Sequence, residues 1–210
     1  GAFRAAWIAT VANIDWPQQQ HIGDTTAMKA DMQMLLDSLR AMHFNAIIFQ
    51  IRPTGDALSQ SNLEPASHWL WGKQSFLNDN ENENDNHNAN TFDALRFVLA
   101  EAHARQMEVH VWLNPYRAVP TMMRDSIIHP THILRSHPEW FFSYGGQRFF
   151  DPGRPETRAW ICDVVEDIVY HCVNLNTQDA PFSCADRERQ VAEILEDPSM
   201  LSSGYLFEPN

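Results

Sequence analysis

The chain has 210 residues, of which 44% are hydrophobic and 11% aromatic, and this apolar content suffices for a folded core and excludes an intrinsically disordered protein. Its formal net charge of −12 at pH 7 argues against nucleic acid and anionic membrane surfaces as partners, because both would repel it. No stretch approaches the ~18 consecutive apolar residues of a membrane-spanning helix. The cysteines have no spacing typical of a metal site and there is no glycine-rich phosphate loop, so we expect neither a metal nor a cofactor.

Apolar runs of strand length alternate along the chain with apolar residues at helical spacing. This alternation predicts βαβ units and therefore an α/β protein with a parallel sheet. The expected elements, in chain order, are a strand at 3–11, a helix capped by Thr25 or Thr26 that runs to Met42, a strand at 45–51, a helix capped by Thr91 that runs to about Gln106, a strand at 108–113, a short helix near 131–136, an aromatic hairpin at 141–150 centred on Gly145 and Gly146, and a helix at 156–172.

The second and third predicted strands place apolar and polar side chains on opposite faces. Phe49 lies on the apolar face, whereas Gln50 and Arg52 point the other way at the carboxyl end of the second strand. Trp112 and Asn114 take the corresponding place in the third strand. A barrel needs this arrangement, with apolar side chains outward under the helices and polar ones inward at the mouth. We therefore predict a partial (β/α)8 barrel of the TIM type, about its first half.

The segment 77–90 alternates asparagine with acidic residues and histidine. Oxygen-rich side chains are the ligands that calcium prefers, but this segment has no glycine at which a calcium loop could turn sharply. We therefore predict a disordered surface loop without a bound cation. Residues 1–172 are expected to form the N-terminal part of the barrel around this loop, and residues 173–210 a divergent tail.

Polar and aromatic side chains gather at the predicted strand ends. Carboxylates, amides and aromatic rings at one mouth suit sugar recognition, because amides and arginine bond hydroxyl and carbonyl groups while an indole stacks on the C–H face of a sugar ring. Asp56 is the candidate catalytic carboxylate; for Asp56 and Arg52 the alternative role is a brace between two loops. The expected substrate-binding residues are Asp15, Trp16, Gln50, Arg52, Trp112, Asn114, Tyr116 and Arg117.

Several blocks of the sequence resemble the glycosyl-hydrolase-like-10 family. They follow the family's order and run from Phe3 to about His171. The blocks are Trp7-Ile8-Ala9-Thr10-Val11, Asn13-Ile14-Asp15-Trp16-Pro17, Phe49-Gln50-Ile51-Arg52-Pro53, Asp56-Ala57, Gly72-Lys73-Gln74, Glu101-Ala102-His103, His110-Val111-Trp112-Leu113-Asn114-Pro115-Tyr116-Arg117, His137-Pro138-Glu139-Trp140 and Asp151-Pro152-Gly153.

The resemblance implies a (β/α)8 glycoside hydrolase-like protein of the bacterial envelope. Such a protein is extracytoplasmic (periplasmic, envelope-bound or secreted) and acts on a cell-wall glycan or another polysaccharide. Some similar members hydrolyse peptidoglycan strands that have lost their peptides, so a glycan of this kind is the partner that the resemblance implies.

The chain departs from the family's pattern after Tyr170. Family members continue into a strand similar to Asp-Gly-x-x-Phe-Asp-Asp-Tyr-Phe, whose paired aspartates are the best catalytic candidates, whereas Val173 to Asn210 contains no such strand. Two hypotheses follow. The first is a glycoside hydrolase whose catalytic site is incomplete in this chain, with Asp15 and Asp56 as the acids best placed to contribute. The second is a non-catalytic glycan-binding or inactive fragment.

Overall fold

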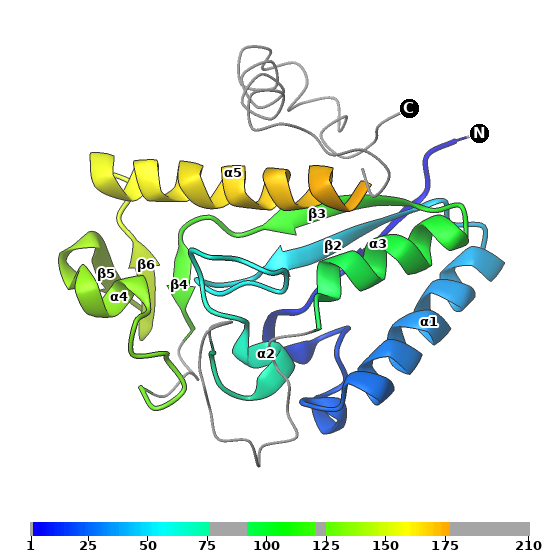
Figure 1. Cartoon of the computed structure of the whole chain (residues 1–210), viewed down its shortest axis with the longest axis horizontal. Coiled ribbons are helices and arrows are strands. Elements are labelled where there is room, and N and C mark those ends of the chain that lie inside the picture. Colours follow the sequence, from blue (N-terminus) through cyan, green and yellow to red (C-terminus); the bar gives the residue numbers. More distant parts are fainter. Residues whose placement is uncertain (1, 76–91, 121–124, 177–210) are drawn as a thin grey trace.

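A computed structural model describes residues 2–75, 92–120 and 125–176 of the chain (Figure 1). Its central feature is a parallel sheet, as the alternation of strands and helices predicted, and the fold is α/β. The strands lie in the order β1 (Ala5–Ile8), β2 (Ala46–Arg52) and β3 (Glu108–Leu113). Closure into a barrel is not seen among these three strands, so the partial barrel stays a prediction.

A second, antiparallel sheet lies beyond the carboxyl ends of the parallel strands (Figure 1). Gly145 and Gly146 have positive φ angles of 57° and 77°, which fit the tight turn of a hairpin and which glycine adopts without a steric cost. The predicted aromatic hairpin is therefore confirmed. The strands lie in the order β4 (Arg117–Val119), β6 (Gln147–Phe150) and β5 (Phe141–Tyr144).

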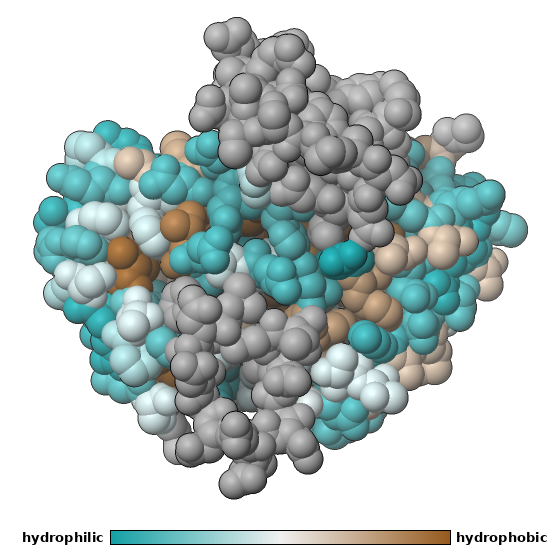
Figure 2. Space-filling view, viewed as in Figure 1, coloured by the Kyte–Doolittle hydropathy of each residue, from teal (hydrophilic) through white to brown (hydrophobic). Residues whose placement is uncertain are grey.

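The three long helices cover one face of the parallel sheet, because their apolar residues and the odd-numbered residues of β2 form one buried cluster. Met32 of α1, Val98 of α3 and Ile168 of α5 join Phe49 in this cluster. The helices are α1 (Thr25–Ala41), α2 (His68–Trp71), α3 (Ala94–Ala104), α4 (Ile133–Ser136) and α5 (Pro155–Asn176), with 3-10 turns η1 (Val11–Asn13), η2 (Gln19–His21) and η3 (Pro138–Trp140). On the face that Figure 2 shows, the coloured residues are mostly hydrophilic, with scattered apolar patches.

The predicted helix caps were wrong for α1 and α3. The cap of α1 is Asp24, whose carboxylate accepts a hydrogen bond from the Ala27 backbone N–H. Asp93 caps α3 in the same way, by accepting from Arg96 N. An aspartate at this position satisfies an unpaired N–H and adds a favourable interaction with the helix dipole, which explains the preference over threonine.

The first strand is shorter than the predicted span 3–11. Strand β1 ends at Ile8, and the chain then turns in η1, where Ala12 and Asn13 adopt positive φ angles of 53°. The predicted loop at 77–90 lies outside the described residues, as does the predicted tail beyond residue 176. No helix in the described part of the chain is long and apolar enough to cross a membrane.

Candidate functional site

A hydrogen-bonded amide pair joins the carboxyl ends of the three parallel strands. Gln50 of β2 is fully buried, and its Oε1 accepts from the backbone N–H groups of Thr10 and Val11 at 3.0 Å each. Its Nε2 donates to Asn114 Oδ1 at 2.7 Å, just after β3. Because Gln50 also lies opposite Trp112 in the sheet register, the structure brings these predicted residues together at one end of the sheet.

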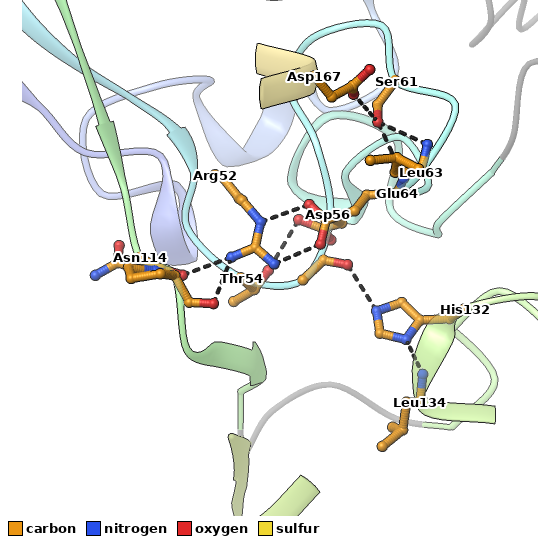
Figure 3. Close-up of polar contacts among 12 residues, drawn as sticks. Arg52, Thr54, Asp56, Ser61, Leu63, Glu64, Asn114, His132, Leu134 and Asp167 are labelled. Carbon is orange, nitrogen blue, oxygen red and sulfur yellow. Dashed lines mark hydrogen bonds and ion pairs between the residues drawn. The ribbon is translucent and has the colours of Figure 1, made fainter. Parts of the chain in front are cut away.

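A buried ion pair stands next to this junction. Arg52 holds both carboxylate oxygens of Glu64, with Nε to Oε2 at 2.6 Å and Nη2 to Oε1 at 2.5 Å (Figure 3). Its third nitrogen, Nη1, donates to the carbonyl oxygens of Asn114 and Pro115. Both side chains of the pair are almost completely buried. The guanidinium therefore ties the loop after β2 to the end of β3, and its burial keeps it from facing solvent in this arrangement.

The Asp56 carboxylate is enclosed by the loop that follows β2. It has 0% exposure, and its Oδ1 accepts from Thr54 Oγ1 at 3.0 Å. Its Oδ2 accepts from His68 Nδ1 at 2.7 Å, from His68 N at 3.3 Å and from Gln74 Nε2 at 3.2 Å. Since a carboxylate only accepts, the His68 proton resides on Nδ1. The Nε2 of His68 is buried and has no partner among the described residues.

The electrostatic setting of Asp56 keeps it ionised. Burial raises the pKa of its carboxyl, but the charge and hydrogen bond of His68, together with hydrogen bonds from Gln74 and Ser67, outweigh burial and lower the pKa to about 2. A general acid has to carry a proton at working pH, and a nucleophile has to reach the substrate. The geometry of Asp56 fits neither requirement and favours the role of a brace.

Asp56→Asn is expected to lower the free energy of unfolding by about 2 kcal/mol at pH 7. The pKa of Asp56 is depressed in the folded state, so its stabilising contribution is present above the ordinary value of 3.8 and is lost as the pH falls toward about 2. Urea unfolding at pH 7, 5 and 3 should therefore show the gap between wild type and variant closing at low pH. Asp163→Asn, at an exposed position of α5, is the control and should open no such gap; a gap independent of pH would contradict the assignment.

The hydrogen bonds around Arg52 and Asp56 form one buried network, and a buried histidine, His132, is hydrogen-bonded to the same loop. His132 Nε2 donates to Gly55 O at 2.8 Å, while its Nδ1 accepts from Leu134 N at 3.0 Å (Figure 3). Burial lowers the pKa of His132, which agrees with a neutral ring that donates through one nitrogen and accepts through the other. A Cβ at Gly55 would lie 3.1 Å from His132 Nε2, so the absence of a side chain there permits the close approach.

The remaining predicted residues differ in their access to solvent. Trp16 is 1% exposed, packs edge-on against Phe49 and donates from Nε1 to Met28 O, so the structure places it in the core and not at a sugar-facing surface. Asp15 is exposed, although its Oδ2 accepts from Ala9 N at 2.7 Å. Trp112, Tyr116 and Arg117 are half-buried.

Sequence reasoning did not single out four members of the network as functional candidates: Glu64, His68, Gln74 and His132. They lie far from the strand ends in sequence, and no periodic pattern marks them. Gln74 lay in a family-like block, and this was the one signal that could have found it. The described residues hold no group of three or more His, Cys, Asp or Glu side chains arranged to bind a metal ion.

Comparison with known families decides what kind of protein this is. The family model described as glycosyl hydrolase-like 10 matches residues 2–176. The chain belongs to this family. The glycosyl hydrolase YngK of Bacillus subtilis (strain 168) is 34% identical over 189 residues, which cover 88% of this chain and 34% of that protein. The glycosyl hydrolase DigH of Escherichia coli (strain K12) is 31% identical over 180 residues, covering 79% of this chain and 38% of that protein.

The chain thus spans little more than a third of the length of these curated relatives. Among solved structures, a maltogenic α-amylase, AmyB from Thermotoga neapolitana, aligns over 92% of this chain and 43% of its own. The TM-score is 0.46 and the sequence identity is 14%.

Proposed function

We propose that this chain is the glycan-binding part of a glycoside hydrolase that acts on a bacterial cell-wall glycan outside the cytoplasm. Membership of the glycosyl hydrolase-like 10 family over residues 2–176 is the observation that carries the proposal. The preferred substrate is a peptidoglycan strand without its peptides, which is the glycan that the resemblance of the sequence to some family members implies.

The half-buried and exposed groups beyond the parallel strands supply the sugar contacts. Trp112 of β3 lies opposite Gln50 of β2. Its ring forms a T-shaped pair with that of Trp7, with ring centroids 5.0 Å apart. Trp112 is half-buried, and the accessible part of its indole supplies an apolar surface for the C–H face of a sugar ring. Asp15 and Tyr116 add a carboxylate and a hydroxyl for sugar hydroxyl groups. The buried network around Arg52 holds the loops that carry these groups in place.

Hydrolysis of a glycan requires catalytic carboxyl groups in addition to binding residues. A glycosidase places two carboxyl groups across the scissile bond, about 5–5.5 Å apart for retention or about 6.5–9.5 Å for inversion. Asp56 is buried and bonded on both oxygens, which leaves Asp15 as the exposed acid of the two candidates. This observation favours a chain that binds a glycan and does not cleave it by itself, which is the non-catalytic alternative.

Residues 1–210, incubated with peptide-free peptidoglycan strands, are expected to sediment with the strands without releasing new reducing ends. Two readouts on one sample, bound protein and reducing ends, separate binding from hydrolysis. Albumin and strands without protein serve as the controls.

Each outcome decides one part of the proposal. Release of reducing ends that Asp15→Asn abolishes would overturn the proposed lack of hydrolysis and would make Asp15 catalytic. Absence of binding to these strands and to chitin oligosaccharides alike would overturn the proposed glycan function.

A further inference from the structure

The antiparallel sheet presents two unlike faces. In antiparallel pairs, directly opposed residues share a face and alternate residues return to it. Phe141 opposes Phe150, and both pack in the smaller buried cluster with Ile161 of α5. Phe150 also receives the Arg52 guanidinium, whose Cζ lies 5.7 Å from the ring centroid. This face is therefore turned toward the buried network of the candidate site.

The opposite face is aromatic and open to solvent. Phe142 opposes Phe149, Tyr144 opposes Gln147, and Arg117 of β4 opposes Phe149 on the other side. The rings of Phe142 and Phe149 stack with centroids 5.6 Å apart and planes 23° apart, so the two side chains support each other on this face. Tyr144 is 75% exposed and Phe142 is 46% exposed. We call these five residues the aromatic platform.

The charge of the platform is opposite to that of the chain. Arg117 is the charged member of the platform, and strands β4, β5 and β6 contain no acidic residue, whereas the chain as a whole carries a net charge of −12. The other arginine of the sheet, Arg148, opposes Ser143 and lies on the opposite face. Among the described residues, neither guanidinium makes a hydrogen bond or ion pair, in contrast to Arg52, Arg105 and Arg154. A half-buried guanidinium without a protein partner beside flat aromatic rings is available to an anionic ligand.

We propose that the aromatic platform, which includes Arg117, is a second glycan-binding surface separate from Asp15, Trp112 and Tyr116, and that it selects sugars carrying a carboxylate. Phe142, Phe149 and Tyr144 stack on the C–H faces of sugar rings, while Gln147 bonds a hydroxyl group. Arg117 pairs with the sugar carboxylate in a bidentate geometry. The proposal rests on the proposed function and adds the chemical feature by which a cell-wall strand is distinguished from a neutral polysaccharide.

The test compares two glycans that share a backbone of amino sugars. Peptide-free peptidoglycan strands carry a carboxylate on every second sugar, and chitin oligosaccharides carry none. Calorimetric titration of residues 1–210 should give a lower Kd for the former. Tyr144→Ala and Phe142→Ala should each weaken binding of both glycans by roughly 3–10-fold, the range that one aromatic contact supports. Arg117→Gln should weaken binding of the carboxylated strand alone.

The matched control is Phe3→Ala, at an aromatic residue of comparable exposure outside this sheet, and it should leave both affinities unchanged. All the changed side chains are exposed or half-buried, and circular dichroism verifies that each variant is folded. Wild-type binding that Tyr144→Ala and Phe142→Ala leave intact would overturn the platform while the proposed function stands. Failure of the wild type to bind either glycan would overturn both the platform and the proposed function.

A change in oligomeric state gives a further outcome. If Tyr144→Ala changes the oligomeric state on light scattering and leaves the glycan affinity unaltered, a second copy of the chain occupies the platform and the glycan assignment is overturned.

Discussion

Arg52→Met is expected to lower the free energy of unfolding by about 3–5 kcal/mol, because it leaves the Glu64 carboxylate buried without its partner. The variant also removes the donors to the carbonyl oxygens of Asn114 and Pro115. A folded domain is stable by only about 5–15 kcal/mol, so this loss is a large fraction of the total. Urea unfolding monitored by tryptophan fluorescence measures it.

Two further variants separate the buried charge from other effects. Replacing both Arg52 and Glu64 with methionine should recover much of the loss, because an apolar pair of similar volume has no charge to desolvate. Arg105→Met is the matched control: Arg105 also contacts two carboxylates, those of Asp37 and Glu101, but on the surface. It should cost far less than Arg52→Met, since exposed ion pairs contribute little. Equal losses for Arg52→Met and Arg105→Met would contradict this account.

The elements that follow local rules were predictable from the sequence. The strand at 108–113 has the predicted bounds, and β2 differs from its predicted span by one residue at each end. The alternation of Phe49 with Gln50 assigned each side chain to its observed face, because the period of a strand is two residues. The hairpin at Gly145 and Gly146 was predictable for the same kind of reason, since few residues accept positive φ.

The buried network was not predictable because its partners are set by the path of loops. The Arg52 side chain was expected to face a ligand. It forms an ion pair with Glu64 instead, which lies 12 residues away in a loop without periodicity. His132 reaches Gly55 across 77 residues. A polar residue at a strand end is compatible with both an open site and a buried brace, and only the three-dimensional path of the loop decides between them.

Self-association of residues 1–210 in solution is the second large effect that we expect. Helices α1, α3 and α5 cover one face of the parallel sheet, whereas the other face exposes Phe3 and Trp7, the latter at 61%. Among the described strands, β1 and β3 each pair on one side only. Unpaired strand edges beside apolar side chains favour pairing with another chain, and burial of apolar surface contributes about 25 cal/mol per Å2. Light scattering and binding of a hydrophobic dye measure this.

Trp7→Gln should reduce both the dye binding and the mass measured by light scattering, because it removes the largest exposed ring of this face at little cost to the core. Met34→Gln is the control. Met34 is 66% exposed on α1, on the helical side, so its replacement should leave association unchanged. A wild-type chain that is monomeric and melts cooperatively above about 60 °C would contradict the expectation, because ordinary domains melt at about 45–65 °C with both faces of the sheet covered. Equal effects of Trp7→Gln and Met34→Gln would show that association does not proceed through the open face of the sheet.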